Sequence, residues 1–537
     1  MLALLVFTSG LFLYTVHIRK PWRGVLSEEH HQWVTGSALK FTHNWYAEDP
    51  VSLKFAMLEL PKSVESPTIA ERDTYMSYPP GLVVPIYVLS EVTGHPPTAS
   101  LVMKYNLLNH FLIAFVLGML AYLIARTLKV SRITSLIFAV IPVLLELLLP
   151  GPLYFHQNIY FSDTAVILPV CLLILVEVLE WHPRRPLSPR ALQWARAGLL
   201  FVGTLIDWQF VFLAVGLYLF RLAAGRLGKD LKTMVQRSLG FGVPVAGALA
   251  LFLMQVAALH SFNKLLERYF LRTGSECYTA GPGFSFGFTY WQQYFPSAFG
   301  DLATGVMWAS LGLFVVGSGV LAVRAVRRRA VSSPMVYLFG LMGLLVAVPF
   351  LRIYTLRCHS LLHDFTTIFF SPAIALVPFV VIPLLLINLE AGRPDREHFR
   401  RPWIPLALAA LALIYVLAVH PGYEALFPQP NRHYAAVGNF LQTHTGYRDV
   451  VFSPDYEIAS KPPQGLAYSH KRVYHINGLE DIRRARVKGD YQIKVFVNDV
   501  SAPHAEYLDE LRAMATNATQ QDGMLLFDVD QKRLRNP

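Results

Sequence analysis

The sequence predicts an all-α polytopic membrane protein that ends in a small extramembrane α/β domain. Of its 537 residues, 54% are hydrophobic and only 15% are charged, whereas soluble domains carry about 25% charged residues. The apolar residues also gather in blocks long enough to cross the roughly 30 Å hydrocarbon core of a bilayer as helices. This composition excludes a disordered chain, and the block length excludes a transmembrane β-barrel, whose strands are shorter and alternate in polarity.

The apolar blocks are the predicted spans, and they stop well before the end of the chain. In order they cover residues 2–16, 107–124, 133–149, 164–179, 197–220, 240–259, 305–323, 335–350, 365–387 and 404–419. The chain is polar after that, and β-type runs at residues 449–452 and 493–497, with helix-like stretches around them, predict a small α/β fold. We expect residues 1–420 to form the transmembrane domain and residues 421–537 the extramembrane domain.

Basic residues orient the predicted spans. Much of the net charge of +11 lies in short loops between the blocks, where it marks the cytoplasmic side and does not indicate a nucleic-acid partner. These loops are residues 126–132, 184–196, 221–237, 324–329 and 393–401. Basic loops flank both ends of residues 197–220, so we expect two short helices there that dip into the membrane and turn near Asp207. The expected topology is a cytoplasmic N-terminus, about eleven spans in the plasma (inner) membrane and a C-terminal domain on the non-cytoplasmic side.

The first outer loop, residues 18–100, opens with a cluster of titratable residues. Glu28 and Glu29 stand between Ser27 and two histidines. Adjacent carboxylates at a membrane face can supply a catalytic base or bind a cation. The alternative is a solvated helix start, with Ser27 as the N-cap and the acids in the first turn, where the helix dipole favours them.

The same loop carries an aromatic segment next to two prolines. Tyr75 and Tyr78 precede Pro79 and Pro80. The prolines fix their own φ angles and end any helix, so they can hold both tyrosine rings rigidly near the membrane. The alternative is that the tyrosines are ordinary residues of the interfacial aromatic belt.

Asp163 ends the second outer loop, at the mouth of the fourth span. A charged residue costs about 2.5–3.5 kcal/mol at the centre of a membrane helix and less at its end, so an acid in this position is a functional candidate. The alternative is a helix N-cap, a role that is compatible with the first. Asp207, at the predicted turn between the two short helices, is a functional candidate for the same reason.

Cationic residues stand in the two remaining outer loops. Arg272 lies in the third, and Arg357, His359 and His363 lie with Arg352 in the fourth. Outward-facing arginine and histidine suit a phosphate or pyrophosphate group, and the alternative is snorkelling beside the interface. Neither histidine belongs to a zinc pattern such as H-E-x-x-H, and the chain lacks the G-x-x-x-x-G-K-[ST] motif of nucleotide-driven pumps. Cys277 and Cys358 are also in outer loops, where a disulfide between them is one option.

These features together resemble the GT-C glycosyltransferases, in particular the branch of the protein O-mannosyltransferases and the aminoarabinose (lipid A) transferases. The resemblance rests on the acidic pair Glu28-Glu29, on the Pro-Pro motif after an aromatic at residues 75–81, and on Asp163 at the mouth of the fourth span. The paired short helices and the soluble C-terminal domain are also similar. The sequence departs from the aminoarabinose pattern at Tyr78, where a lysine commonly precedes the two prolines.

The resemblance implies a polyprenyl- or dolichyl-phosphate-linked sugar donor that binds from the membrane lipid, and a glycan, lipid or protein acceptor. It implies that Glu28 or Glu29 is the catalytic base and that Asp163 helps to position the base or the acceptor. The expected donor- or acceptor-binding residues are Tyr75, Tyr78, Arg272, Arg357, His359 and His363. A divalent metal is not favoured as a cofactor, because no D-x-D triplet lies in an outer loop near these acids.

Two other functions stay open at this point. One is a transporter or flippase of lipid-linked glycans, and the other is a non-catalytic subunit of a membrane glycan-assembly complex. Transporters usually carry internal repeats and charges near the bilayer midplane. Here no repeat is visible and the candidate residues gather at one membrane face, so the leading prediction is a glycosyltransferase that transfers a hexose or pentose.

Overall fold

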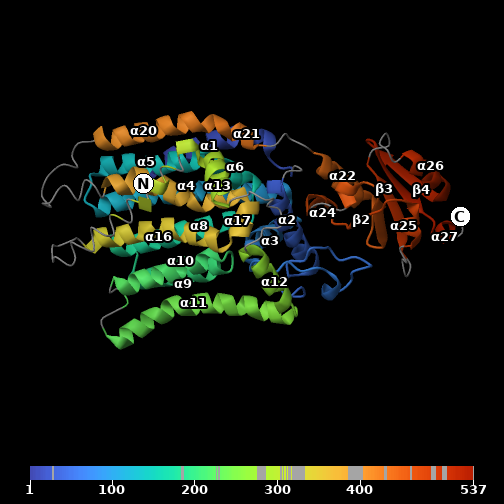
Figure 1. Ribbon diagram of the computed structural model, residues 1–537, viewed down its shortest axis with the longest axis horizontal. Coiled ribbons are helices and arrows are strands. Elements are labelled where there is room, and N and C mark those ends of the chain that lie inside the picture. Colours follow the sequence, from blue (N-terminus) through green and yellow to red (C-terminus); the bar gives the residue numbers. More distant parts are fainter. Residues whose placement is uncertain are drawn as a thin grey trace. The chain divides into compact units, whose positions relative to one another are not determined.

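The computed structural model describes two compact units (Figure 1). One contains Met1–Pro21, Met76–Leu82 and Met103–Phe427, and the other contains Trp22–Tyr75, Val83–Val102 and Pro428–Pro537. The first outer loop therefore contributes to both units. The structure describes all residues except 27–29, 183–186, 225–226, 228–229, 275–285, 303–304, 306, 310, 313–315, 317–332, 385–402, 428–431, 460–462, 485–490, 499–504 and 536–537.

The first unit is built from apolar helices. Its longer helices are α1 (Leu2–Ile18), α4 (Ala99–Thr127), α5 (Arg132–Leu148), α8 (Ile167–Trp181), α9 (Pro189–Thr204), α10 (Gln209–Ala223), α11 (Leu231–Ala258), α12 (Phe262–Thr273), α16 (Ser333–Thr355) and α20 (Trp403–Val419). Shorter elements join them, including α6 (Pro150–Asn158), α7 (Ser162–Ala165), α13 (Phe286–Thr289), α14 (Phe295–Phe299), α17 (Arg357–Leu362), η5 (Asp364–Phe370), α18 (Ser371–Leu376) and α21 (Tyr423–Leu426).

The lengths and compositions of these helices are those of a multi-pass membrane protein. Among the described residues, 6 helices are long and apolar enough to cross a membrane, or 7 if the bent pair α5–α6 counts as one span. The predicted total of about eleven spans stays a prediction, because parts of several apolar blocks lie outside the described residues. The all-helical character of the unit agrees with the sequence.

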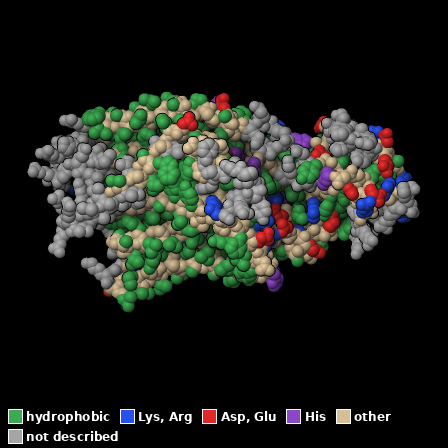
Figure 2. Space-filling model, viewed as in Figure 1, with side chains coloured by type: hydrophobic (Ala, Val, Ile, Leu, Met, Phe, Trp, Pro, Cys, Tyr) green, Lys and Arg blue, Asp and Glu red, His purple; other side chains and the backbone are tan. Residues whose placement is uncertain are grey.

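Lipid-facing surfaces are recognisable from burial. Only 22% of the apolar window of α11 and 17% of that of α20 are buried, whereas the value is 83% for Ser162–Trp181. The exposed side chains on α11 and α20 include Leu239, Met254, Leu406 and Leu417. Figure 2 shows this unit covered largely by hydrophobic side chains on its visible face. Such large exposed apolar surfaces are stable when lipid surrounds them.

The two short helices expected around Asp207 are present as α9 and α10, and a buried ionic clamp joins them to α8. Glu177 on α8 accepts hydrogen bonds from Arg196 on α9 at 2.5 Å and from Arg221 on α10 at 2.6 Å. Both arginines also contact Glu180. Because a single unpaired charge would be costly in this environment, the clamp fixes how α9 and α10 lie against α8.

The second unit combines helices with one five-stranded sheet. Its helices are α2 (His30–Glu48), α3 (Val84–Thr93), α22 (His433–His444), α23 (Tyr456–Ala459), α24 (Pro463–Ser469), α25 (Leu479–Arg484), α26 (Ala505–Met514) and α27 (Gln531–Arg535). Its strands are β1 (Asp449–Ser453), β2 (Val473–His475), β3 (Gln492–Val497), β4 (Ala515–Gln521) and β5 (Met524–Val529). The order is β2-β1-β3-β5-β4, with β2, β1 and β3 parallel and the β5 and β4 pairings antiparallel.

Both faces of the sheet are covered, which explains why its central strands are apolar. On β3, Val495 and Val497 pack into one cluster and Phe496 packs into another on the opposite face. The β4–β5 hairpin turns at Asp522 and Gly523, which have φ angles of 49° and 82°. Two positive φ angles are what a tight two-residue hairpin turn requires, and Asp-Gly is a preferred pair for it. The predicted small C-terminal sheet is thus present.

A pair of stacked imidazoles joins α2 to the end of α24 within the second unit. The rings of His43 and His470 lie 3.1 Å apart between centroids with an interplanar angle of 16°. Burial lowers the pKa of His43 from 6.5 to about 4. Burial and the neighbouring His43 lower the pKa of His470 to about 3. Both rings are therefore neutral in the folded unit at neutral pH.

We predict that acid loosens the contact between α2 and α24. In the unfolded chain both histidines take up protons near pH 6.5, so the unfolded state binds more protons than the folded state below that value. Their contribution to stability is complete above pH 6.5 and is lost as the pH falls towards 4. Hydrogen exchange of His30–Glu48 and Pro463–Ser469 between pH 7 and pH 4 measures this loss, after correction for the intrinsic exchange rate. His43→Phe removes one titrating ring and should reduce the loss; an equal loss in the variant would contradict the assignment.

Candidate functional site

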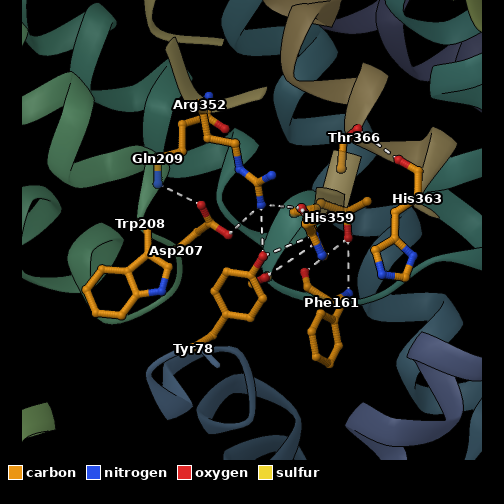
Figure 3. A network of polar contacts seen from close by, with 12 residues as sticks. Tyr78, Phe161, Asp207, Trp208, Gln209, Arg352, His359, His363 and Thr366 are labelled. Carbon is orange, nitrogen blue, oxygen red and sulfur yellow. Dashed lines mark hydrogen bonds and ion pairs between the residues drawn. The ribbon is translucent and has the colours of Figure 1, made fainter. Parts of the chain in front are cut away.

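A network of buried polar side chains lies inside the first unit (Figure 3). It joins Tyr78 from the Met76–Leu82 segment, Asp163 on α7, Asp207 at the corner between α9 and α10, Arg352 on α16 and His359 on α17. Four of them are completely buried, and His359 is 5% exposed. Segments far apart in the sequence thus deliver two acids, two basic groups and a phenol to one place.

Arg352 is the centre of this network. Its Nη2 donates to Asp163 Oδ1 and to the hydroxyl of Tyr78, each at 2.9 Å. The same nitrogen lies 3.8 Å from Asp207 Oδ2. The guanidinium carbon also lies 4.6 Å from the centroid of the Phe369 ring. In Figure 3 the guanidinium group points between Asp207 and the Tyr78 hydroxyl. One cation placed among two carboxylates offsets much of the cost of burying all three charges.

Asp163 lies within the first turn of α7. Residues 159–161 approach in an extended conformation, and Phe161, at the N-cap position, donates its backbone N–H to the hydroxyl of Thr164 at 3.3 Å. Asp163 is therefore not the N-cap. Its carboxylate instead faces Arg352, and its Oδ1 lies 3.6 Å from Nε2 of His359. The helix N-terminus favours the negative charge in this turn.

The Pro-Pro motif holds Tyr78 by hydrogen bonds on both sides. The indole of Trp208 donates to the Ser77 carbonyl at 2.9 Å, and the Tyr160 hydroxyl donates to the Leu82 carbonyl at 2.7 Å. Gly81 donates its backbone N–H to the Leu205 carbonyl at 2.8 Å. A Cβ at Gly81 would lie 2.3 Å from that oxygen, so only glycine permits this approach.

The Tyr78 side chain, fixed in this way, also contacts His359 and Arg272. Its hydroxyl lies 3.1 Å from Nε2 of His359, and the guanidinium of Arg272 lies 4.5 Å from its ring centroid. The His363 ring is 4.4 Å from that of His359. A tyrosine thus takes the place before the two prolines that a lysine commonly takes in the aminoarabinose transferases. In that place it holds a hydroxyl against Arg352 and an aromatic face against Arg272.

The structure separates some of the residues that the sequence grouped together. Glu28 and Glu29 lie outside the described residues. Tyr75 belongs to the second unit, where its N–H bonds to the Met57 carbonyl at 2.8 Å and its ring lies 5.6 Å from that of Phe41. Arg357 is exposed, and its Nε donates to the Gly274 carbonyl at 3.2 Å. The predicted roles of these residues therefore stay predictions.

The sequence indicates two members of the network only weakly. Arg352 stands in the fourth outer loop with no role predicted for it, and Asp207 is only a secondary candidate. Both are ionisable residues in or beside apolar blocks, Asp207 within residues 197–220 and Arg352 just after residues 335–350. A charge in such a place is a functional candidate by default, so this signal was available for both.

The cysteines of the first unit differ in state. Cys358 on α17 is disulfide-bonded, and Cys277, which the sequence offers as one option for its partner, lies outside the described residues. Cys171 is a buried free thiol.

In the part of the chain that the structure describes, no group of three or more His, Cys, Asp or Glu side chains is arranged to hold a metal ion. The sequence-based expectation that no metal is obligatory stays untested.

Comparison with solved structures reveals the fold. The structure of ArnT from Cupriavidus metallidurans bound to undecaprenyl phosphate matches with a TM-score of 0.57 at 12% identity, over 99% of both chains. The Archaeoglobus fulgidus oligosaccharyltransferase tethered to an acceptor peptide with an NVT sequon matches with a TM-score of 0.53 at 11% identity, over 99% of this chain and 74% of that one. This chain has the GT-C fold. The GT-C resemblance found in the sequence is confirmed at the level of the fold.

A third solved structure supports the same fold. Archaeal AglB from Archaeoglobus fulgidus, in complex with an inhibitory peptide and a dolichol-phosphate, has a TM-score of 0.51 at 12% identity over 98% of this chain and 74% of its own. No protein-family model and no curated protein sequence matches the chain. At this identity the GT-C likeness carries the architecture alone, and residue roles rest on the geometry of the site.

We predict that Arg352→Met strongly destabilises the first unit. The substitution leaves Asp163 and Asp207 buried without their cation, which costs about 3–5 kcal/mol and lowers the melting temperature of the purified protein in detergent. Adding Asp207→Asn removes one of the unpaired charges and should raise the melting temperature above that of the single variant. Arg357→Met, at an exposed position, is the control and should change stability by about 0.5 kcal/mol or less. Equal melting temperatures for the Arg352 and Arg357 variants would contradict the central role of Arg352.

Proposed function

We propose that the protein is a membrane glycosyltransferase that uses a polyprenyl- or dolichyl-phosphate-linked sugar and modifies an acceptor on the non-cytoplasmic face. The observation that carries the proposal is the buried Asp163–Arg352 pair next to Tyr78 and His359, within a GT-C fold. The ArnT structure that shares this fold along almost its full length holds undecaprenyl phosphate. A glycan, a lipid or a protein could be the acceptor, and membrane lipid surrounds the site.

The proposed reaction needs a base on one side of the sugar and positive charge on the other. The base takes the proton from an acceptor hydroxyl, the acceptor oxygen forms the bond to the anomeric carbon, and the bond from that carbon to the phosphate oxygen breaks. The lipid phosphate leaves with the bonding electrons and therefore gains negative charge. Arginine and histidine side chains near the leaving oxygen stabilise that charge.

The residues divide between these tasks by their chemistry. Glu28 or Glu29 is the proposed base. Asp163, paired with Arg352, is suited to orienting the base or the acceptor hydroxyl, since its carboxylate accepts hydrogen bonds in a fixed direction. Arg272, Arg357 and His363 are the proposed phosphate ligands, because Arg357 is exposed and the other two are partly exposed beside the rings of Tyr78 and His359. Tyr78 supplies aromatic surface, and His359 links Tyr78 to Asp163.

We predict that Glu28→Gln, Glu29→Gln or Asp163→Asn abolishes sugar transfer while the protein still reaches the membrane. Loss of a general base lowers the rate by about 10²–10⁴-fold. The assay offers a panel of undecaprenyl-phosphate-linked sugars to membranes that contain the protein, and mass spectrometry measures the undecaprenyl phosphate released. Glu91→Gln, at an exposed position on α3, is the matched control and should retain full activity.

Three results would contradict the proposal or its assignment of residues. Full activity in all three variants would remove the acids from the site. Counterflow of intact donor lipid in proteoliposomes, with no release of undecaprenyl phosphate, would show a flippase in place of an enzyme. Activity that appears only when a second membrane protein is added would support the role of a non-catalytic subunit.

A further inference from the structure

The helix pair that leads to Asp163 is sharply bent. The axes of α5 and α6 differ by 58° at a break around Leu149. Pro150 begins α6, where its missing N–H and fixed φ angle permit a new helix but not the continuation of the old one. Such a break leaves backbone carbonyl groups without helical partners, and in a membrane protein other groups must satisfy them.

Two of these carbonyls, those of Glu146 and Leu148, have a proline four residues later and therefore no N–H partner from the helix. His110 Nε2 donates to the Glu146 carbonyl at 2.9 Å, and His420 Nδ1 donates to the Leu148 carbonyl at 2.8 Å. Within α6, Arg19 also donates to the Leu153 carbonyl at 2.9 Å. Asn106 donates to two further carbonyl oxygens, those of Phe155 and Ile159, at 3.1 and 2.7 Å. Side chains from distant segments therefore hold the bend by specific hydrogen bonds.

One side-chain pair spans the bend directly. Glu146 lies on α5 and His156 on α6, and the distance from Glu146 Oε1 to His156 Nε2 is 3.4 Å. Both side chains are completely buried. Neither ring nitrogen of His156 has a hydrogen-bond partner among the described residues, so the carboxylate is the group that compensates the polarity of this imidazole. The hydroxyl of Ser371 on α18 fixes the other carboxylate oxygen at 2.9 Å.

A second imidazole lies beside the pair. The His110 ring stacks on that of His156 at 4.7 Å between centroids and 22°, and its Nε2 lies 3.9 Å from Glu146 Oε1. Arg19 Nη1 lies 3.4 Å from His110 Nδ1. The Glu146 carboxylate thus lies beside two imidazoles, one of which also contacts the Arg19 guanidinium.

Both members of the Asp163–Arg352 pair are tied to this bend. The chain leaves α6 at Asn158 and reaches Asp163 in α7 within one short extended stretch. On the other side, η5 packs against both α6 and α7. Phe369 at the end of η5 lies against Arg352, and Ser371, two residues later, binds Glu146. A change in the angle between α5 and α6 would therefore move Asp163 relative to Arg352.

We propose that Glu146 and His156 form a latch that fixes the bend between α5 and α6 and so positions Asp163 in the site. They are positioning residues, because they act through α6 and do not touch the Asp163 network. The catalytic consequence of the latch rests on the proposed glycosyltransferase function. The latch itself does not, since it predicts a local change in backbone exchange whatever reaction the protein performs.

The test compares two substitutions of His156 in the purified full-length protein. His156→Leu removes the polar contact, whereas His156→Gln keeps an amide donor that can reach Glu146. In His156→Leu we expect faster hydrogen exchange in residues 151–158 and a fall in kcat of about 10–100-fold, the effect of a misplacement of about 1 Å, with the KM for the undecaprenyl-phosphate sugar changed by about twofold or less. His156→Gln should recover most of both losses. Glu177→Gln, a buried glutamate in the α8–α10 clamp, is the control and should leave exchange in residues 151–158 unchanged.

A second variant covers the case in which His156→Leu does not fold. Adding Glu146→Gln removes the unpaired charge, so the double variant should fold and show the same faster exchange and lower kcat. Unchanged exchange in the folded variants would overturn the latch, and faster exchange with unchanged kcat would overturn its positioning role. If the wild-type protein transfers no sugar from any donor offered, the proposed function fails while exchange in residues 151–158 still decides the latch.

Discussion

The cost of burying charge is the constraint on which the site depends. Asp163, Asp207 and Arg352 are completely buried within a membrane protein, where each charge alone would cost several kcal/mol. They are stable together because one guanidinium lies among two carboxylates, with the hydroxyl of Tyr78 as a further partner. The arrangement exists only when α7, the α9–α10 corner and α16 pack in one register. The geometry of the site therefore depends directly on the packing of the bundle.

The same principle recurs in two other places in the first unit. At the α5–α6 bend, Glu146 meets imidazoles from α4 and α6, and between α8, α9 and α10 Glu177 meets Arg196 and Arg221. In each cluster a shift of one helix by a turn would leave a buried charge without its partner. In lipid, where apolar contacts discriminate poorly between helix registers, such clusters select one arrangement from many that bury similar apolar area.

The sequence and the structure agree where a residue's position alone is informative. Asp163 is a candidate because an acid at the mouth of an apolar span carries a cost, Tyr78 because two prolines follow it, and His359 because it is a basic group in an outer loop. All three belong to the buried network. The partner of a buried acid cannot be predicted in this way. Asp163 and Arg352 are separated by 189 residues, and no local pattern connects them. Closeness in sequence is also a poor guide to closeness in space: Tyr75 and Tyr78 are three residues apart and belong to different units, since the chain passes from one unit to the other between them.

The sequence by itself determined that this is a helical membrane protein with a small C-terminal α/β sheet, because apolar length, loop charge and strand periodicity are local properties that solvent and lipid select. Its short motifs also indicated the GT-C fold. Only the tertiary structure decided that Arg352 is the common partner of two acids, that Tyr78 is clamped against it, and that a bend at Leu149 leads to Asp163. These are contacts between distant segments, and their energies depend on distances of a few ångströms that appear only when the helices are packed.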